Sequence, residues 1–286
     1  MAVPKLIGST PAFLQDLARQ MGPMQAMAFD VDGTLADSSS QVRPQTIDAI
    51  SRLSRAGVQP VIVTGRIFPA AAKVLHDAGC PGIVIANNGA IVGDGRTDEI
   101  IYRAPMPAEL SHALVETGRE YGLSITLFLL RGMMSDQDDF SARFLKDANE
   151  GITVEIGDID AVEPDDIFKV MYAHPEASYL DEIGPALTEK FPDLQRSLDN
   201  YFEIVGPGEG KKKALHKTIE MHEWDPAKMA GFGDGGNDVH WMPEVGWPIA
   251  VENARPEVAA IARAQIGHHD DDAVAEFIDA YLEVFG

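Results

Sequence analysis

Short apolar runs alternate with amphipathic stretches near the start of the chain. The segments MAFDV, VQPVIV and GIVIA are almost wholly apolar, and a helical pattern follows each of the first two. The first helical pattern stops at Gly57, a residue type that commonly ends helices. Apolar strands separated by helices are typical of a parallel sheet that is covered on both faces. This part of the chain is therefore predicted to be an α/β domain.

The same alternation returns after residue 206. A helical stretch, KKKALHKTIEMHEW, precedes the apolar runs KMAGFGD and WPIAVEN, and a last helical pattern closes the chain. Before residue 24, Phe13, Leu14 and Leu17 recur at helical spacing and indicate a short amphipathic helix. We therefore assign residues 1–89 and 207–286 to one core domain with a Rossmann-like parallel sheet.

The middle of the chain follows a different pattern. Its apolar runs, among them SITLFLL, IFKVMYAH and YFEIVG, are more widely spaced and suggest antiparallel strands with helices between them. Such a mixture is typical of an α+β unit, so residues 90–206 are predicted to be an inserted α+β domain. Glycine accepts large backbone changes, and we expect hinges near Asn88 and in the stretch GPGEG that begins at Gly206.

Composition and charge restrict the class of protein. Of the 286 residues, 45% are hydrophobic and 24% are charged, as in ordinary folded proteins. The net charge of −22 works against binding to nucleic acid or to anionic membranes. No secretory signal or membrane-spanning run is recognisable, and the single cysteine, Cys80, cannot form an internal disulfide. We expect a cytoplasmic protein.

Two acids, Asp30 and Asp32, follow the first apolar run directly and precede Gly33 and Thr34. A carboxylate at the end of a buried strand loses hydration, which costs several kcal/mol unless a cation, a partner or a proton compensates. An ordinary turn would also explain an Asp-Gly pair. The other strand ends decide between these two interpretations.

Further polar groups follow the later strands. They are the hydroxyl and backbone amides of Thr64 and Gly65, the lysine Lys211, and the acids and amide of GDGGND, which are Asp234, Asn237 and Asp238. Ligands bind at the carboxyl ends of parallel strands, so these groups are predicted to meet the two first acids at one edge. Carboxylate oxygens suit Mg²⁺, while the lysine and the amides suit a phosphate.

The motifs resemble those of the haloacid dehalogenase superfamily, in its Cof-type branch, subfamily IIB. The family's first motif appears as DVDGT, its threonine motif as VIVTGR and its last motif as GDGGND, in the family's order. The resemblance runs from residue 24 almost to the end of the chain. It implies a phosphatase fold in which the inserted domain is a cap that selects the substrate.

The resemblance also implies the catalytic roles. Asp30 would be the nucleophile that forms an aspartyl-phosphate, and Asp32 would protonate the leaving alcohol and then activate water. Thr64, Gly65 and Lys211 would hold the transferring phosphoryl group. Because relatives that cleave other bonds lack an acid at the place of Asp32, its presence favours phosphate esters.

The resemblance implies a Mg²⁺ site as well. Asp30, Asp234 and the backbone carbonyl of Asp32 would bind the ion, with Asp238 and Asn237 supporting the site from beside it. Asp238 is counted with the metal site, and Asn237 with the phosphate-binding groups. The implied substrate is a small phosphorylated metabolite, most often a sugar phosphate; a phosphomutase or a phosphatase of flavin mononucleotide is the alternative.

The sequence departs from the family pattern in two places. The lysine motif reads GEGKKKAL, so Lys212 and Lys213 compete with Lys211 for the role. The stretch HHDDDAVAEF lacks the glycine that usually precedes the position of Val274. There, His268 and His269 beside Asp270 would also suit a second metal.

Several other features leave alternatives open. GFGDGG matches the dinucleotide fingerprint of oxidoreductases, although its aspartate would repel a pyrophosphate. A chain that keeps the fold but only binds its ligand is the other alternative. Arg66 is expected to be structural or to support the site from beside it, and not to bind the phosphate. Asn87 and Asn88 could line the cleft or cap a turn, and Arg131 and Lys169 are candidate substrate contacts.

Overall fold

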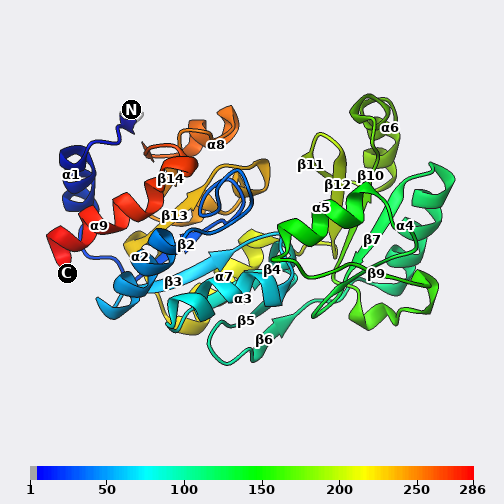
Figure 1. Cartoon of the computed structure of the whole chain (residues 1–286), viewed down its shortest axis with the longest axis horizontal. Coiled ribbons are helices and arrows are strands. Elements are labelled where there is room, and N and C mark those ends of the chain that lie inside the picture. The colour runs from blue at the N-terminus through cyan, green and yellow to red at the C-terminus, as the bar shows by residue number, and fades with distance from the viewer. Residues whose placement is uncertain (1–4) are drawn as a thin grey trace.

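The computed structural model describes residues 5–286, which fold around two separate β-sheets (Figure 1). The larger sheet and its helices form the core, on the left of Figure 1. The smaller sheet and its helices form the cap, on the right. The predicted α/β core with an inserted α+β domain is therefore confirmed.

The elements have the following bounds. The core strands are β1 (Leu6–Ile7), β2 (Ala26–Phe29), β3 (Gln59–Val63), β4 (Ile83–Ala86), β5 (Ile91–Asp94), β6 (Ile100–Arg103), β13 (Met229–Gly233), β14 (Trp247–Ala250) and β15 (Ala264–Gln265). The core helices are α1 (Pro11–Met21), α2 (Pro44–Arg55), α3 (Phe68–Ala78), α7 (Lys211–His222), α8 (Pro256–Ile261) and α9 (Ala273–Phe285). The cap holds β7 (Ser124–Phe128), β8 (Met133–Ser135), β9 (Glu155–Ile156), β10 (Lys169–Ala173), β11 (Gln195–Leu198), β12 (Tyr201–Val205), α4 (Ala108–Glu120), α5 (Phe140–Ala148) and α6 (Ala177–Lys190).

The core sheet is parallel over most of its width. Its strand order is β1-β15-β14-β13-β2-β3-β4-β5-β6, and every pair from β1 to β4 is parallel. Alternate side chains of β2 enter two different hydrophobic clusters. Met27 and Phe29 pack with α1, α2, α3 and α9, whereas Ala26 and Ala28 pack with α7 and α8. Both faces are thus covered, as the apolar runs predict.

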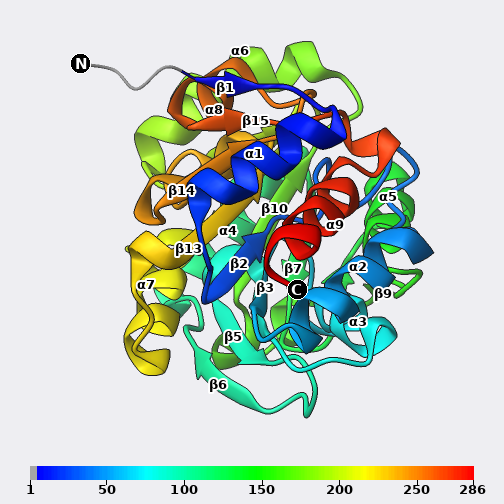
Figure 2. The same ribbon diagram turned by 90° about the vertical axis from the view of Figure 1, so that its left-hand side faces the viewer.

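The helices α1 and α9 lie side by side at the end of the core that is farthest from the cap (Figures 1 and 2). Thr10 caps α1, because its hydroxyl oxygen accepts a hydrogen bond from the backbone N–H of Phe13 at 3.3 Å. Leu14 and Leu17 are buried, and Phe13 packs against the same cluster. The predicted N-terminal amphipathic helix is therefore confirmed.

The first two strands of the segment 90–206 belong to the core sheet. β5 pairs antiparallel with β4, and β6 pairs antiparallel with β5. The apolar run of β5 is buried against the core, so the inserted domain begins after Arg103 and not at residue 90. The chain enters the cap at Met106, whose N–H donates to the Ile167 carbonyl oxygen, and leaves it after Val205.

The cap sheet has the order β11-β12-β10-β7-β8-β9 and is antiparallel except for the pair β8–β9. Val170 and Tyr172 of β10 pack against α4 and α6 on its outer face. Met171 of the same strand faces the other way, into a cluster that includes Ile67 and Ala70 of the core. One face of the cap sheet is therefore buried against the carboxyl ends of the core strands. No helix among residues 5–286 is long and apolar enough to cross a membrane.

Candidate active site

The polar groups that follow the core strands meet at one edge of the sheet. Asp30 follows β2, Thr64 follows β3 and Asp234 follows β13, and these three strands are neighbours in the sheet. The backbone N–H of Asp30 donates to the Phe232 carbonyl oxygen at 2.9 Å, so the strand pairing continues up to the acid. The predicted meeting of these residues is thus what the structure shows.

Lys211, the first residue of α7, is the lysine that enters this cluster. Its Nζ donates to Asp30 Oδ1 at 2.7 Å and to Asp238 Oδ1 at 2.8 Å, and all three side chains are buried. Lys212 and Lys213 are half exposed and pair instead with Glu244 and Glu209. Of the three lysines that the sequence left open, Lys211 alone contacts the acids.

The burial of Lys211 places its ammonium group in a strong negative field. Burial lowers its pKa, but the Asp238 and Asp30 carboxylates outweigh that effect, and the pKa lies above its ordinary value. A lysine with a raised pKa stays cationic at neutral pH, and it neutralises part of the charge of the two acids.

The remaining negative charge of the cluster is not balanced. Carboxylate oxygens of Asp30, Asp234 and Asp238 lie within 4.8 Å of one another. Burial raises the pKa of Asp30 well above its usual range, and Asp238 adds to that rise. Burial also raises the pKa of Asp234 to about 7, again reinforced by Asp238. A buried group of hard oxygen donors with excess negative charge fits Mg²⁺.

Gly33 and Thr34 hold Asp234 in the cluster. The Thr34 hydroxyl donates to Asp234 Oδ1 at 3.0 Å. Gly33 has φ +79°, and a Cβ on it would lie 2.4 Å from Asp234 Oδ2. The glycine of DVDGT is therefore needed both for its backbone conformation and for the close approach of the carboxylate.

Asp238 has a different environment from the other acids. Its Oδ2 accepts the backbone N–H groups of Asp234 and Gly235, and its Oδ1 accepts Trp241 Nε1 at 2.7 Å in addition to Lys211. Both oxygens are thus occupied by protein donors. The backbone amides that a dinucleotide pyrophosphate would need are also occupied, and only a three-residue 3-10 helix follows β13. This geometry opposes the dinucleotide interpretation of GFGDGG.

Asp32 lies apart from the acid cluster, and its side chain is 47% exposed. Both its oxygens accept hydrogen bonds from Arg66, the shortest being 2.7 Å from Nη2 to Oδ1. Arg66 is buried and also donates from Nη1 to the Glu150 carboxylate of the cap at 2.8 Å. The predicted structural role of Arg66 thus includes a direct contact with a predicted catalytic acid.

The turn after β3 carries the predicted phosphate-binding groups. Thr64 is fully buried, and its hydroxyl oxygen accepts the Arg66 N–H at 3.1 Å. The Gly65 carbonyl oxygen accepts Lys169 Nζ of the cap at 2.8 Å, and the Ile67 N–H donates to Asn149 Oδ1 at 2.9 Å. Together with the Glu150 contact to Arg66, these hydrogen bonds connect the cap to three consecutive residues of the turn, 65–67.

A cavity of about 390 Å³ lies between the core and the cap beside these residues. Its core side is lined by Asp30, Asp32, Gly65, Asp234 and Asn237, among others. The carboxyl ends of the core strands therefore open onto a space that is suitable for a small molecule. A second cavity of about 450 Å³ lies near Lys211 and is lined by Asn88 and Asn237.

The remaining residues that the sequence suggested as cleft or substrate contacts lie in different parts of the structure. Lys169 lines the cavity, as expected of a substrate contact, but Arg131 is exposed and donates to the Asp98 carbonyl oxygen, away from the acids. Asn88 Oδ1 lies 3.5 Å from Asn237 Nδ2, and its φ of +52° is that of a tight turn. Asn88 thus both lines a cavity and forms the turn after β4.

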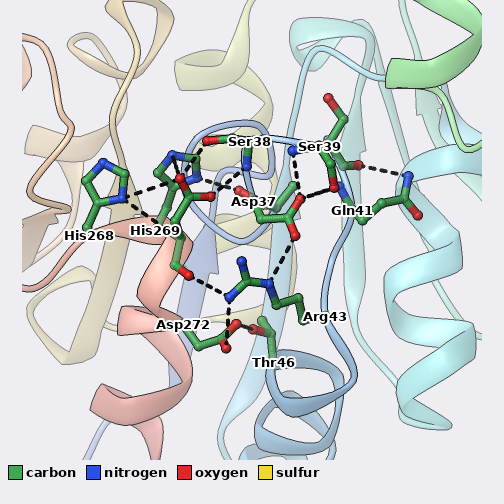
Figure 3. A network of polar contacts seen from close by, with 12 residues as sticks. Asp37, Ser38, Ser39, Gln41, Arg43, Thr46, His268, His269 and Asp272 are labelled. Carbon is green, nitrogen blue, oxygen red and sulfur yellow. Dashed lines mark hydrogen bonds and ion pairs between the residues drawn. The ribbon is translucent and has the colours of Figure 1, made fainter.

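The histidines form part of a polar network shown in Figure 3. His269 Nδ1 lies 2.8 Å from the Ala36 carbonyl oxygen, and both oxygens of Asp270 accept hydrogen bonds from Ser38. Arg43 joins Asp37 to Asp272 in the same network. Although His268, His269 and Asp270 are close enough to share an ion, these contacts suffice to explain them as a link between two loops.

Three cap residues at the site were not found by reasoning on the sequence. Glu150, Asn149 and Glu203 contact Arg66, the Ile67 N–H and Lys169 respectively. They stand in segments without a motif, and only the packing of the cap on the core brings them to the site. No signal in the sequence alone identifies them.

A family model described as haloacid dehalogenase-like hydrolase matches residues 27–278. A pyridoxal phosphate phosphatase from Escherichia coli is 24% identical over 270 residues, which cover 90% of this chain and 98% of the relative. An HMP-PP phosphatase from Yersinia pestis is 27% identical over 262 residues, which cover 89% of this chain and 94% of the relative.

The fold is similar to that of solved structures as well. One of them is a subclass IIB sugar phosphatase, with a TM-score of 0.77 and 20% identity. The matched part covers 90% of this chain and 98% of that one.

Proposed function

The chain belongs to the haloacid dehalogenase-like hydrolases and is one of their phosphatases, and we propose that it hydrolyses a small phosphomonoester through an aspartyl-phosphate on Asp30. The observation that carries this proposal is the buried contact of 2.7 Å between Asp30 and Lys211, beside a cavity that Asp32 also lines. Nucleophile, cation and a second carboxylate are the groups that this chemistry requires.

In the first step, an oxygen of Asp30 forms a bond to phosphorus while the bond from phosphorus to the leaving oxygen breaks. Asp32 gives its proton to that oxygen, so the product leaves as an alcohol. Lys211 fixes the orientation of the nucleophile, since its ammonium group binds one of the two Asp30 oxygens. Thr64 and the Gly65 backbone amide lie at the next strand end and would hold the transferring oxygens.

In the second step, water attacks the phosphorus of the aspartyl-phosphate, and the bond to Asp30 breaks. Asp32 takes the proton of the water, which restores both carboxyl groups and releases inorganic phosphate. Two displacements with a positioned acid and base thus replace one difficult displacement by water.

We propose Mg²⁺ as the cofactor, held by Asp30, Asp234 and the backbone carbonyl of Asp32. The donor set fits the ion, because burial and the Asp238 carboxylate raise the pKa of Asp234, and a divalent cation would offset both effects. When bound, it would neutralise the acids and the phosphoryl group together. Asp238 is proposed to support the site from beside it, since its oxygens are occupied by protein donors.

The proposal is tested by hydrolysis of p-nitrophenyl phosphate with Mg²⁺ and with excess EDTA. We expect turnover that needs the metal and disappears in Asp30→Asn, and that is retained in Asp16→Asn, an exposed acid of α1. Turnover that survives the loss of Asp30 would overturn the mechanism. Release of inorganic phosphate, rather than transfer to a second hydroxyl, separates a hydrolase from the phosphomutase alternative.

The relatives leave the substrate open, because their names refer to pyridoxal phosphate, HMP-PP and sugar phosphates. A sugar phosphate is what the family resemblance suggests, and flavin mononucleotide is the cofactor phosphate to include in a panel. The residues that line the cavity restrict the choice of substrate further.

A further inference from the structure

The cap side of the cavity has a composition that restricts the leaving group. This inference rests on the proposed function, because it assumes that the phosphoryl group lies at Asp30. A cavity of about 390 Å³ is near the lower end of the range for ligand sites, roughly 300–1,000 Å³. It therefore has room for a phosphoryl group and one compact leaving group.

The cations of the cavity are already paired. Lys169 donates to the Gly65 carbonyl oxygen at 2.8 Å and to Glu203 at 3.1 Å, and its ammonium lies 3.8 Å from the centre of the Phe128 ring. Arg66 is bound to Asp32 and Glu150. Among the lysines and arginines that line the cavity within residues 5–286, this leaves Arg255, which is exposed and donates to the Ser197 carbonyl oxygen at 3.2 Å.

Acids line the same space beyond the phosphoryl site. Glu203 and Asp37 lie there in addition to Asp32, and these acids are paired with Lys169, Arg43 and Arg66 respectively. A second phosphate or a carboxylate on the leaving group would therefore find no free buried cation in the cavity to offset its desolvation. The leaving group that this cavity accepts has no negative charge of its own.

The cap supplies an apolar platform in front of this space. Phe144 of α5 is 39% exposed and Leu198 of β11 is 43% exposed, although both are large and apolar, and both line the cavity. Tyr201 is buried behind Phe144, with ring centres 5.0 Å apart and an interplanar angle of 30°. The Phe144 ring is thus supported on one side and exposed on the other, which suits stacking with a flat ring.

One polar group at the platform lacks a partner. The Ser197 hydroxyl oxygen is buried and has no hydrogen-bond partner in the part of the chain that the structure describes, and Ser197 lines the cavity. Buried hydroxyls are nearly always hydrogen bonded, so this hydroxyl is expected to turn toward the cavity and to bind a ligand atom there. By contrast, Asn149 already donates to the Leu145 carbonyl oxygen and accepts from the Ile67 N–H.

We propose that the leaving group is a flat aromatic ring without net charge and with at least one polar substituent, attached to a single phosphate through an alkyl oxygen. Phe144 and Leu198 would contact the faces of the ring, and Ser197 would bind the substituent. This is the class of heteroarylmethyl monophosphates, as opposed to sugar phosphates and diphosphates.

The test compares kcat/KM for four phosphates with Mg²⁺ present. Benzyl phosphate and pyridoxal 5′-phosphate carry a flat aromatic ring, whereas glucose 6-phosphate and acetyl phosphate do not. We expect the native enzyme to prefer the two aromatic substrates. Phe144→Ala should lower kcat/KM for both by roughly tenfold, the value of one good aromatic contact, and should leave acetyl phosphate within about twofold. Ile156→Ala is the matched control, since this cap residue is 46% exposed and lies outside the cavity.

Ser197→Ala provides a second, independent readout. We expect it to lower kcat/KM for pyridoxal 5′-phosphate several-fold and to leave benzyl phosphate unchanged, because only the former carries polar ring substituents. A native preference for glucose 6-phosphate, or an equal effect of Phe144→Ala on all four substrates, would overturn the inference and leave the phosphatase proposal intact. No metal-dependent hydrolysis of any of the four would instead count against the proposed function itself.

Discussion

Arg66 of the core and Glu150 of the cap form a buried ion pair, with Nη1 and Oε1 2.8 Å apart. The same guanidinium binds Asp32 through Nε and Nη2. Glu150 stands just after α5, where its φ of +57° turns the chain back toward the core. A cap residue thus shares one cation with the proposed acid and base, and this contact exists only when the cap lies against the core.

Replacing Glu150 by glutamine is expected to impair leaving-group protonation. With Glu150 neutral, Arg66 is balanced by Asp32 alone and holds this carboxylate more firmly away from the leaving oxygen. We expect kcat to fall roughly 3- to 10-fold for an alkyl phosphate, a small part of the ~10²–10⁴-fold that a positioned acid contributes. For p-nitrophenyl phosphate the change should be less than about twofold, because its leaving group hardly needs a proton.

The measurement is kcat and KM for both substrates in Glu150→Gln and in Glu155→Gln, an exposed acid of β9. An equal loss for both leaving groups would mean that Glu150 only stabilises the cap. Glu150→Asp should restore part of the difference if the charge on the cap is what matters.

Lys169→Met is expected to destabilise the protein strongly. The Lys169–Glu203 pair is almost fully buried, and removal of one partner leaves an uncompensated buried charge. Such changes cost about 3–5 kcal/mol, whereas replacement of both partners is often nearly neutral. The double variant Lys169→Met with Glu203→Gln should therefore recover most of the loss. Unfolding in urea measures both, and a double variant as unstable as the single one would contradict this account.

Gly33→Ala is expected to displace Asp234 and to weaken metal binding by more than tenfold. The new Cβ would lie 2.4 Å from Asp234 Oδ2, and the backbone at φ +79° adds strain. Gly57→Ala is the matched control, because its φ of +90° brings similar strain while nothing lies within 4 Å of the new atom. Calorimetric titration with Mg²⁺ separates the two effects. Equal affinities in the two variants would show that the contact does not matter.

The sequence was sufficient to predict the fold of the core domain and the polar residues at the ends of its strands. Asp30, Thr64 and Asp234 could be placed at one edge because strand ends in a parallel sheet must share it. The lysine could not be chosen from GEGKKKAL by pattern alone, since burial against Asp30 is a tertiary property. The boundary between the core and the inserted domain was placed too early, at residue 90, because the apolar strand β5 pairs with β4 and extends the core sheet.

The contacts between the cap and the core could not be predicted from the sequence, for a different reason. Glu150 and Glu203 are two of 45 acidic residues, and nothing local separates them from solvent-exposed ones. Their roles arise from the packing of one face of the cap sheet on the turn that contains Gly65 and Arg66. Lys169 could be named as a candidate but not given a role, because its partners come from both domains.

The stability of the metal-free protein is expected to fall as pH rises from about 4 to 7. Burial raises the pKa of Asp234 to about 7 in the folded chain, while an unfolded aspartate has a pKa of about 4. Between these values the folded state binds a proton that the unfolded state has lost, so proton binding favours folding at the acidic end of this range. Asp37 opposes this trend only near the unfolded pKa of about 4, because hydrogen bonds from Ser39 hold its folded pKa well below its usual range. Its stabilising contribution is complete above about pH 5 and is lost toward lower pH.

Excess Mg²⁺ should abolish this decline, because the cation replaces the proton as the partner of Asp234. The measurement is the Tm between pH 4.5 and 7.5, with EDTA and with Mg²⁺, for the native chain and for Asp234→Asn. The variant should lose part of the pH dependence in EDTA, because the raised pKa of Asp30 acts in the same direction, and most of the gain from Mg²⁺, whereas Asp16→Asn should follow the native curves. If the native Tm rises over this range in EDTA, Asp234 is not protonated in the folded state. The acid cluster would then be compensated by Lys211 alone, and the argument for a divalent cation would lose its electrostatic basis.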